Sequence, residues 1–281
     1  MNDEHAAGAD PADAQVGRQS RVGAKREPGE AMQAASPAPA MRESGNLLLD
    51  ALSDAQYRKL EPHLEVVPLP VGRVLSGSDD RPTHVYFPRT GIVSMLMALE
   101  DGASEEVAVT GNEGLIGVSA FLEHGRGGAS PRSSVVQHAG HALRLPARFL
   151  AEQFDRDGEF LRLLLRYTQA LVTQIAQTVV CNRHHRIAQQ LCRWLLVRLD
   201  RLPGCEINVT QERIATLLGV RREGITAAVA DLRRAGLIRL QRGRVTVLDR
   251  PGLERKACEC YAVIRKEYAR LLTDKRASRS S

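Results

Sequence analysis

The chain has 281 residues, of which 43% are hydrophobic, so it is long enough for two domains that each have a core. Residues 186–281 carry 21 Lys or Arg against 10 Asp or Glu, although the net charge of the whole chain is only +6. This basic C-terminal third indicates binding to a polyanion such as nucleic acid, and the alternative is a solvated basic face. Neither a long apolar stretch nor a signal peptide occurs, so we expect a cytoplasmic protein without a membrane partner.

Residues 1–44 are rich in Ala, Gly, Pro, Ser and charge and almost lack large apolar side chains, which predicts a disordered tail. From Leu47 to Leu64 the apolar residues recur at helical spacing. Ser53 is placed to cap a second short helix that begins at Asp54.

Short apolar or alternating runs extend from Val66 to about Leu145 and are separated by turn residues, which is typical of strands. The glycines that mark these turns are fairly evenly spaced: Gly72, Gly77, Gly91, Gly102, Gly111 and Gly140. The pattern predicts a small antiparallel barrel or jelly roll of roughly eight strands.

From Glu159 to about Val180 the pattern predicts one helix, with a length of roughly 33 Å at about 1.5 Å per residue. Its apolar stripe includes Leu164, Leu171, Ile175 and Val179. Such a stripe either forms a coiled-coil dimer seam or packs within its own chain, and we expect the seam.

Residues 210–236 predict two short helices around a tight turn. Thr210 is a favourable N-cap, Gly219 marks the turn, and each helix has one apolar face. Those faces consist of Ile214, Leu217 and Leu218, and of Ile225, Val229 and Leu232. This arrangement is a helix-turn-helix.

The second of these helices has a charged N-terminal end. An Arg side chain can donate two hydrogen bonds to a guanine edge and a Glu can accept one from cytosine, so we predict that Arg222 and Glu223 read bases. Arg221, Thr226 and Gln211 are placed for phosphate or secondary contacts, and Thr210 completes the predicted DNA-binding set. The alternative is a solvated helix face.

The segments LIRLQ and RVTVL alternate as strands on either side of Arg242-Gly243, which predicts a β-hairpin wing. Arg242 and Arg244 would place positive charge against the DNA backbone. A last helix is predicted to begin near Pro251 and to bury one face, made of Leu253, Ala257, Tyr261, Ile264, Tyr268 and Leu271.

Together these features resemble the cAMP receptor protein/FNR (Crp/Fnr) superfamily of transcription regulators over residues 45–272. The segments that carry the resemblance are RIAQQL (186–191), TQERIATLLGV (210–220), VYFPRTGIVSML (85–96) and GNEGLIGVSAFL (111–122). The resemblance implies an α+β fold with a cyclic-nucleotide-binding-like β-roll (jelly roll) over 45–150, a dimerisation helix over 151–185, a Crp-type winged helix-turn-helix over 186–272 and a tail over 273–281. It also implies a homodimer on two DNA half-sites about 34 Å apart.

The resemblance places an effector pocket at Val118, Ser119, Arg132, Ser133 and Leu171. In the family, a Glu holds the ribose hydroxyl and an Arg-Ser pair binds the cyclic phosphate. Here Val118 stands at the Glu position and Leu171 brings no hydroxyl, while Arg132 and Ser133 could still bind an anion. Because lost hydrogen-bond partners weaken the binding of a polar ligand, we expect an unidentified effector, or none, rather than cAMP.

None of the five cysteines precedes Cys181, which excludes the N-terminal iron–sulfur motif of the family and a secreted disulfide framework. Cys258 and Cys260 are predicted to lie about 200° apart around one helix, and Cys181 and Cys192 about 16 Å apart along another. The adjacent His184 and His185 are expected to point apart. We therefore expect inert thiols and no metal or cofactor.

The expected function is sequence-specific DNA binding that recruits or blocks RNA polymerase. No P-loop, G-x-S-x-G or H-E-x-x-H motif occurs, so we do not expect an enzyme. Two alternatives stay open: a cyclic-nucleotide-binding module that regulates a partner protein, and a nonspecific nucleic-acid binder.

Overall fold

The computed structural model of the chain describes residues 44–77, 83–119, 132–156 and 158–273. All of these belong to one compact unit. Both predicted tails lie outside the described residues, apart from Ser44 and Thr273. No helix within these ranges combines the length and the apolar character that a membrane span requires.

Short helices precede the first strand: α1 (Leu47–Asp50), α2 (Asp54–Leu60) and the 3-10 helix η1 (Glu61–His63). Ser53 caps α2 as predicted, because its hydroxyl accepts from the Gln56 N–H. The buried Asn46 caps α1 and donates its amide to the carbonyls of Pro88 and Gly114, at 2.8 and 2.9 Å. Asn46 therefore fixes the start of the chain's folded part to the strands that follow.

The β-roll consists of two antiparallel sheets, with strand orders β1-β7-β3 and β2-β6-β4-β5. The strands are β1 (Glu65–Leu69), β2 (Val74–Ser76), β3 (His84–Pro88), β4 (Ile92–Ala98), β5 (Ser104–Thr110), β6 (Arg132–His138) and β7 (Gly140–Pro146). Phe87, Ile92 and Leu145 are almost completely buried between the sheets and the helices. The predicted antiparallel roll is confirmed, with seven strands described against the roughly eight expected.

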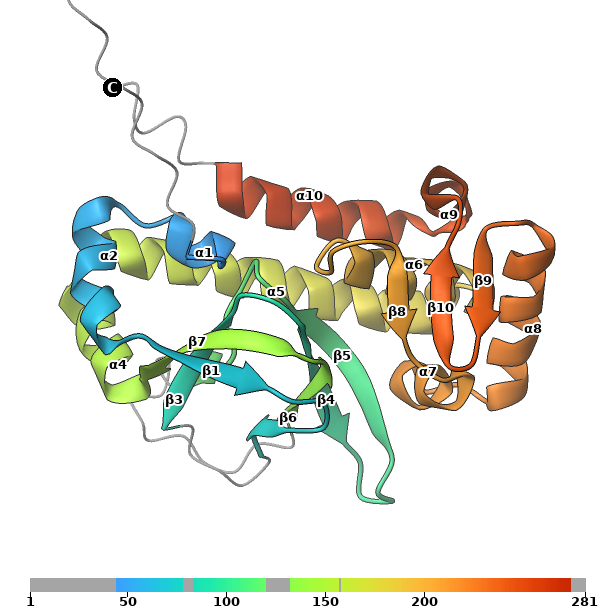
Figure 1. Cartoon of the computed structure of the whole chain (residues 1–281), viewed down its shortest axis with the longest axis horizontal. Helices are drawn as coiled ribbons and strands as arrows, with labels where there is room; N and C mark the ends of the chain where they lie inside the picture. Colours follow the sequence, from blue (N-terminus) through green and yellow to red (C-terminus); the bar gives the residue numbers. More distant parts are fainter. Residues whose placement is uncertain (1–43, 78–82, 120–131, 157, 274–281) are drawn as a thin grey trace, which may run out of the picture. The chain divides into compact units, whose positions relative to one another are not determined.

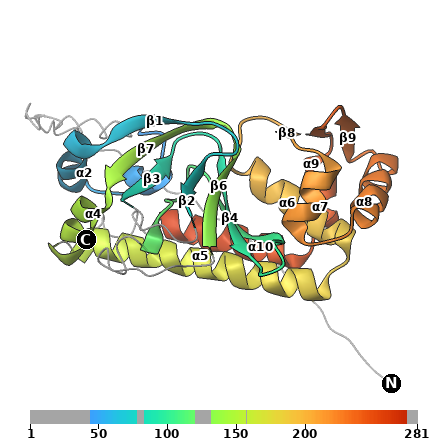
Figure 2. The ribbon, with the colours of Figure 1, turned by 90° about the horizontal axis from the view of Figure 1, so that it is seen from below.

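Two helices follow the roll: α4 (Ala147–Arg156) and the long α5 (Gly158–His184), which runs beside the sheets (Figure 2). The predicted helix from Glu159 to Val180 is confirmed, and α5 extends beyond it at both ends. Tyr167 of α5 is fully buried and donates its hydroxyl to the Leu115 carbonyl at 2.8 Å. A Cβ on Gly114 would lie 2.4 Å from the Tyr167 ring, so the close approach of α5 to the roll requires glycine there.

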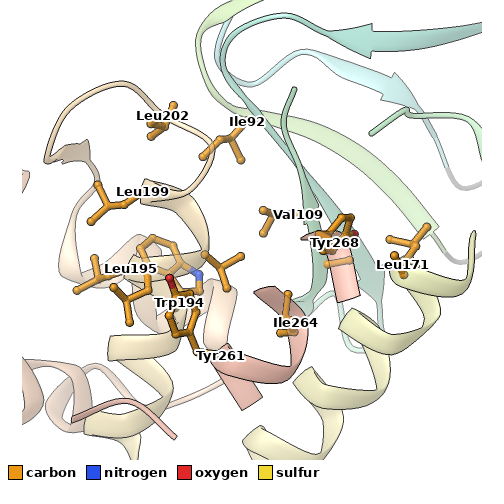
Figure 3. Packing of buried hydrophobic residues seen from close by; sticks show 14 of the residues in the cluster. Ile92, Val109, Leu171, Trp194, Leu195, Leu199, Leu202, Tyr261, Ile264 and Tyr268 are labelled. Carbon is orange, nitrogen blue, oxygen red and sulfur yellow. The ribbon is translucent and has the colours of Figure 1, made fainter. Parts of the chain in front are cut away.

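The C-terminal part contains α6 (Ile187–Leu199), β8 (Glu206–Asn208), α7 (Gln211–Leu218), α8 (Arg222–Arg234), β9 (Ile238–Gln241), β10 (Arg244–Val247), α9 (Arg250–Lys256) and α10 (Glu259–Thr273). The three strands form an antiparallel sheet in the order β8-β10-β9. Helix α10 packs along α5 (Figure 1). The apolar core is continuous across this junction: in Figure 3, Leu171 of α5 lies near Tyr268 of α10, and Trp194 of α6 lies beside Tyr261.

The single last helix predicted from Pro251 onward is wrong. Helix α9 ends at Lys256, and Ala257 takes an extended conformation with φ −68° and ψ 159° before α10 begins at Glu259. Cys258 lies in this break, so Cys258 and Cys260 do not share a regular helix. The predicted separation of about 200° between their side chains therefore does not apply.

Candidate nucleic-acid interface

Helices α7 and α8 form the predicted helix-turn-helix. The Thr210 hydroxyl caps α7 by accepting from the Arg213 N–H at 3.1 Å, and Gly219 ends α7 with a left-handed φ of +63°. The apolar residues that were predicted to face inward are all buried: Ile214, Leu217, Leu218, Ile225, Val229 and Leu232. The local sequence therefore determines both helices and the turn between them.

The N-terminal end of α8 is exposed and charged. Arg221 occupies the N-cap without a side-chain capping bond, and Arg221, Arg222 and Glu223 are all exposed. Guanidinium groups and backbone N–H groups at a helix N-terminus suit contacts to base edges and phosphates. The geometry is therefore compatible with the predicted reading role of Arg222 and Glu223.

Thr226 and Gln211 contact each other. The Thr226 hydroxyl donates to Gln211 Oε1 at 2.9 Å, so the two predicted secondary contacts also connect α8 to α7. Gly224, an unfavourable residue inside a helix, faces α6: a Cβ there would lie 2.5 Å from Cδ1 of Ile187. The glycine thus permits close packing between α8 and α6.

The predicted wing is confirmed as a β9–β10 hairpin with a two-residue turn. Arg242 and Gly243 have positive φ values of 45° and 76°, which are those of a type I′ turn. Arg242 is exposed at the tip. Arg244 of β10 pairs with Glu206 of β8 at 3.3 Å, and both side chains are exposed. Arg242, in the turn itself, is therefore the wing cation that we expect to contact the DNA backbone.

The predicted effector residues lie in different environments. Val118 and Ser119 are half-buried, Ser133 is half-buried in β6, and Arg132 is exposed at the start of that strand. Residues 120–131, which connect the two pairs, lie outside the described residues. Leu171 is 5% exposed and belongs to the apolar core, so it offers no polar group to a ligand.

Two of the predicted dimer residues need correction. Leu164 and Leu171 are 0% and 5% exposed because they pack within their own chain, so they cannot form a seam with a second copy. The exposed apolar residues of α5 are Leu165, Val172, Val179 and Val180. Leu165, Val172 and Val179 are spaced by seven residues and lie on one helix face, and of these three only Val179 is among the predicted dimer residues. Ile175 is half-buried against the core.

A buried polar connection between the β-roll and α6 was not predicted. Glu106 of β5 accepts hydrogen bonds from Arg198 of α6 and from Ser94 of β4, and all three side chains are buried. Arg198 also lies over the Trp194 ring at 3.4 Å. Burial lowers the pKa of Arg198 and the Glu106 carboxylate opposes that shift.

A second buried pair lies beside the first. Arg201, two residues after the end of α6, donates to Glu113 at 2.6 Å and to Gln174 of α5 at 3.2 Å, so it connects the chain there both to the roll and to the long helix. The only sequence signal for these pairs is the occurrence of Arg198 and Arg201, three residues apart, after the apolar run from Trp194 to Val197. A sequence pattern does not show which carboxylates they contact.

The junction also contains a cavity of about 290 Å³ that the sequence does not indicate. Its walls come from the roll, from α6 and from α7, and include Ile92, His138, Trp194, Leu202 and Arg213. Arg213 bonds Gln137 of β6 at 3.1 Å at this junction. A small molecule in the cavity would therefore touch both the β-roll and the helix-turn-helix.

Comparisons with known proteins agree with this architecture. A model of the cyclic nucleotide-binding domain matches residues 66–157, and a model of the Crp-like helix-turn-helix domain matches residues 185–256. A CRP-like cAMP-activated global transcriptional regulator from Mycobacterium tuberculosis is 26% identical over 70% of this chain and 90% of its own length.

Two solved structures share the fold. FixK2 from Bradyrhizobium japonicum is 16% identical with a TM-score of 0.57, and it covers 69% of this chain and 98% of its own. A CRP/FNR-family transcriptional regulator from Thermus thermophilus is 21% identical with a TM-score of 0.55, over 69% of this chain and 98% of its own.

Proposed function

We propose that this chain, which belongs to the Crp/Fnr superfamily of transcriptional regulators, binds a pseudo-palindromic promoter site as a homodimer. The observation that carries the proposal is the exposed N-terminus of α8, where Arg221, Arg222 and Glu223 project from a helix whose other face is buried. Two such helices would occupy successive major-groove turns about 34 Å apart. We further propose that the protein acts on DNA in the cytoplasm.

The second copy is proposed to pack on α5. Leu165, Val172 and Val179 repeat every seven residues and are 48%, 52% and 60% exposed, which is unusual for large apolar side chains on one helix face. Pairing these faces would bury them and would place one α8 on each side of the dimer axis. Substitution of Val172 by Glu should convert the dimer to monomer in analytical ultracentrifugation, whereas Arg58→Glu, exposed on α2, should leave the dimer intact.

The β-roll is proposed to respond to an effector other than cAMP. Leu171 is part of the core and Val118 has no carboxylate, so two hydrogen-bonding positions of a cyclic-nucleotide pocket are apolar here. Calorimetry with cAMP at millimolar concentration should show no binding, and saturable binding would refute this part of the proposal. The buried Glu106–Arg198 and Glu113–Arg201 pairs would transmit the state of the roll to α6.

The output is proposed to be recruitment or blocking of RNA polymerase at the bound promoter. The test of the function is selection from a random duplex pool, which should enrich an inverted repeat. If no repeat is enriched, the specific-regulator proposal fails, and equal affinity for all duplexes would point to nonspecific binding.

Two variants distinguish a residue that contacts bases from one that contacts the DNA backbone. Arg222→Ala should relax base preference at one position of each half-site, with a cost of roughly 1–3 kcal/mol for the preferred base. Arg242→Asn keeps the type I′ turn, because Asn-Gly is favoured there, and should weaken all sequences alike while reducing the salt dependence. Identical behaviour of the two variants would contradict these roles.

A further inference from the structure

Four potential metal ligands meet where α5 ends and α10 begins. They are Cys181 on the last turns of α5, His185 just after that helix, Cys258 in the break between α9 and α10, and Cys260 on the first turn of α10. Their ligand atoms all lie within 4.8 Å of one another. We propose that Cys181, His185, Cys258 and Cys260 bind one zinc ion.

The distances fit a tetrahedral ion. The Sγ atoms of Cys181 and Cys258 are 3.5 Å apart, and Cys260 Sγ lies 3.6 Å from His185 Nδ1. Zinc bonds of about 2.3 Å to sulfur and about 2.0 Å to nitrogen place the ligand atoms of a tetrahedral site roughly 3.5–3.8 Å apart. All four ligands come from protein, which is typical of a structural site. The short spacing favours a single ion over an iron–sulfur cluster, whose thiolates bind separate irons.

The backbone brings the ligands together from two directions. Cys181 and His185 are four residues apart, and the His185 N–H still bonds the Cys181 carbonyl at 3.0 Å, so both side chains lie on one face of the helical turn. Cys258 precedes α10 and Cys260 lies on its first turn, so the two side chains are not held at regular helical positions relative to each other. The break that separates α9 from α10 thus places both thiols at the end of α5.

The second nitrogen of His185 has the partner that a metal-bound histidine usually has. Nε2 lies 3.3 Å from the Glu259 carboxylate, while Nδ1 faces the thiols. A carboxylate in this position fixes the ring orientation and the tautomer that leaves Nδ1 available to the ion. Glu259 is therefore a positioning residue of the proposed site.

The net charge of the proposed site follows from its ligands. Three thiolates and a neutral imidazole around Zn²⁺ carry one net negative charge, and ion binding releases the three thiol protons to water. Cys181, Cys258 and Cys260 are buried, so the ion itself would supply the positive charge that their thiolates need there.

The site would fix the junction between the two domains. His185 is two residues before α6, the first helix of the DNA-binding part, and Cys260 is on the helix that packs along α5. A metal here would attach the α9–α10 segment to the end of the long helix. It would thereby restrict the hinge through which the roll can move the helix-turn-helix.

Metal analysis of the full-length chain, purified under reducing conditions without chelator, should find one zinc ion per chain. A Cys258→Ser/Cys260→Ser variant should lose the metal, whereas Cys192→Ser, buried elsewhere, and Cys205→Ser, exposed, should keep it. After removal of zinc, Co²⁺ should give the intense visible bands of a tetrahedral thiolate site in the wild-type chain. This measurement needs no variant to fold.

The positioning role of Glu259 has its own test. Glu259→Gln should lower the zinc affinity roughly 10–100-fold, which is typical when the hydrogen-bond partner of a metal-bound histidine is removed. Glu267→Gln on the same helix should leave the zinc affinity unchanged. Equal affinities for both variants would overturn that role. The absence of zinc together with no cobalt spectrum would overturn the site itself, as would a Cys181–Cys258 disulfide trapped by alkylation in freshly lysed cells.

Discussion

The buried Glu106–Arg198 pair gives the sharpest stability prediction. Glu106→Gln keeps the shape of the side chain but removes its charge, which leaves the guanidinium of Arg198 buried without a counter-charge. The two side chains are 6% and 3% exposed, so water cannot replace the lost carboxylate. Breaking a buried pair on one side costs roughly 3–5 kcal/mol of unfolding free energy.

The exposed Glu206–Arg244 pair provides the matched control. These side chains are 49% and 56% exposed, and an ion pair in such a position contributes about 0–1 kcal/mol. Glu206→Gln makes the same chemical change in the same chain. The structure therefore predicts a difference of about 2–5 kcal/mol between two substitutions that look alike in the sequence.

Urea unfolding followed by tryptophan fluorescence measures both variants. Trp194 is the only tryptophan in the chain, and its ring lies beneath Arg198, so the signal comes from the site of the perturbation. The double substitution Glu106→Leu with Arg198→Met should recover most of the loss, because it removes the second charge as well. If Glu106→Gln costs no more than Glu206→Gln, or if the double variant is as unstable as the sum of its parts, the reasoning is wrong.

Three further changes test other parts of the fold. Gly114→Ala should destabilise by roughly 1–3 kcal/mol, because the new methyl group would meet the Tyr167 ring, whereas Gly158→Ala at the start of α5 should be neutral or stabilising; equal effects in thermal unfolding would contradict this. Thr210→Ala should cost about 1 kcal/mol through loss of the α7 cap, and recovery in Thr210→Ser would identify the cap as the cause. Burial lowers the pKa of His138 below its ordinary value of 6.5, so stability should fall as the pH drops below 6.5, where the unfolded chain binds the proton more readily; His138→Gln should flatten this slope, and an unchanged slope would exclude His138 as its source.

Features that depend on neighbouring residues were predictable from the sequence. Thr210, Gly219 and the spacing from Ile214 to Leu232 determine the helix-turn-helix through capping, a left-handed turn and one apolar face per helix. The same holds for the Arg242-Gly243 hairpin, whose turn conformation follows from strand twist and loop length. In each case the determining contacts lie within a few residues along the chain.

Which face of the long helix remains exposed could not be predicted in the same way. Leu164, Leu171, Val172 and Val179 all belong to the apolar surface of α5, and the sequence treats them alike. Packing of the roll and of α10 covers the first two and leaves the last two exposed. Leu164 and Leu171 were therefore wrongly predicted as dimer residues, because the elements that cover them are far away in the sequence.

The amino-acid sequence by itself determined the two-domain plan, the periodicity of its helices and strands, and the charged N-terminal end of α8, since these follow from local propensity and from patterns within one element. Only the tertiary structure decided that the chain breaks at Ala257, that Cys258 and Cys260 meet Cys181 and His185, and that Arg198 contacts Glu106. The contacts among them join residues 75 to 92 positions apart, and they form because the packed core brings together elements that are far apart in the sequence.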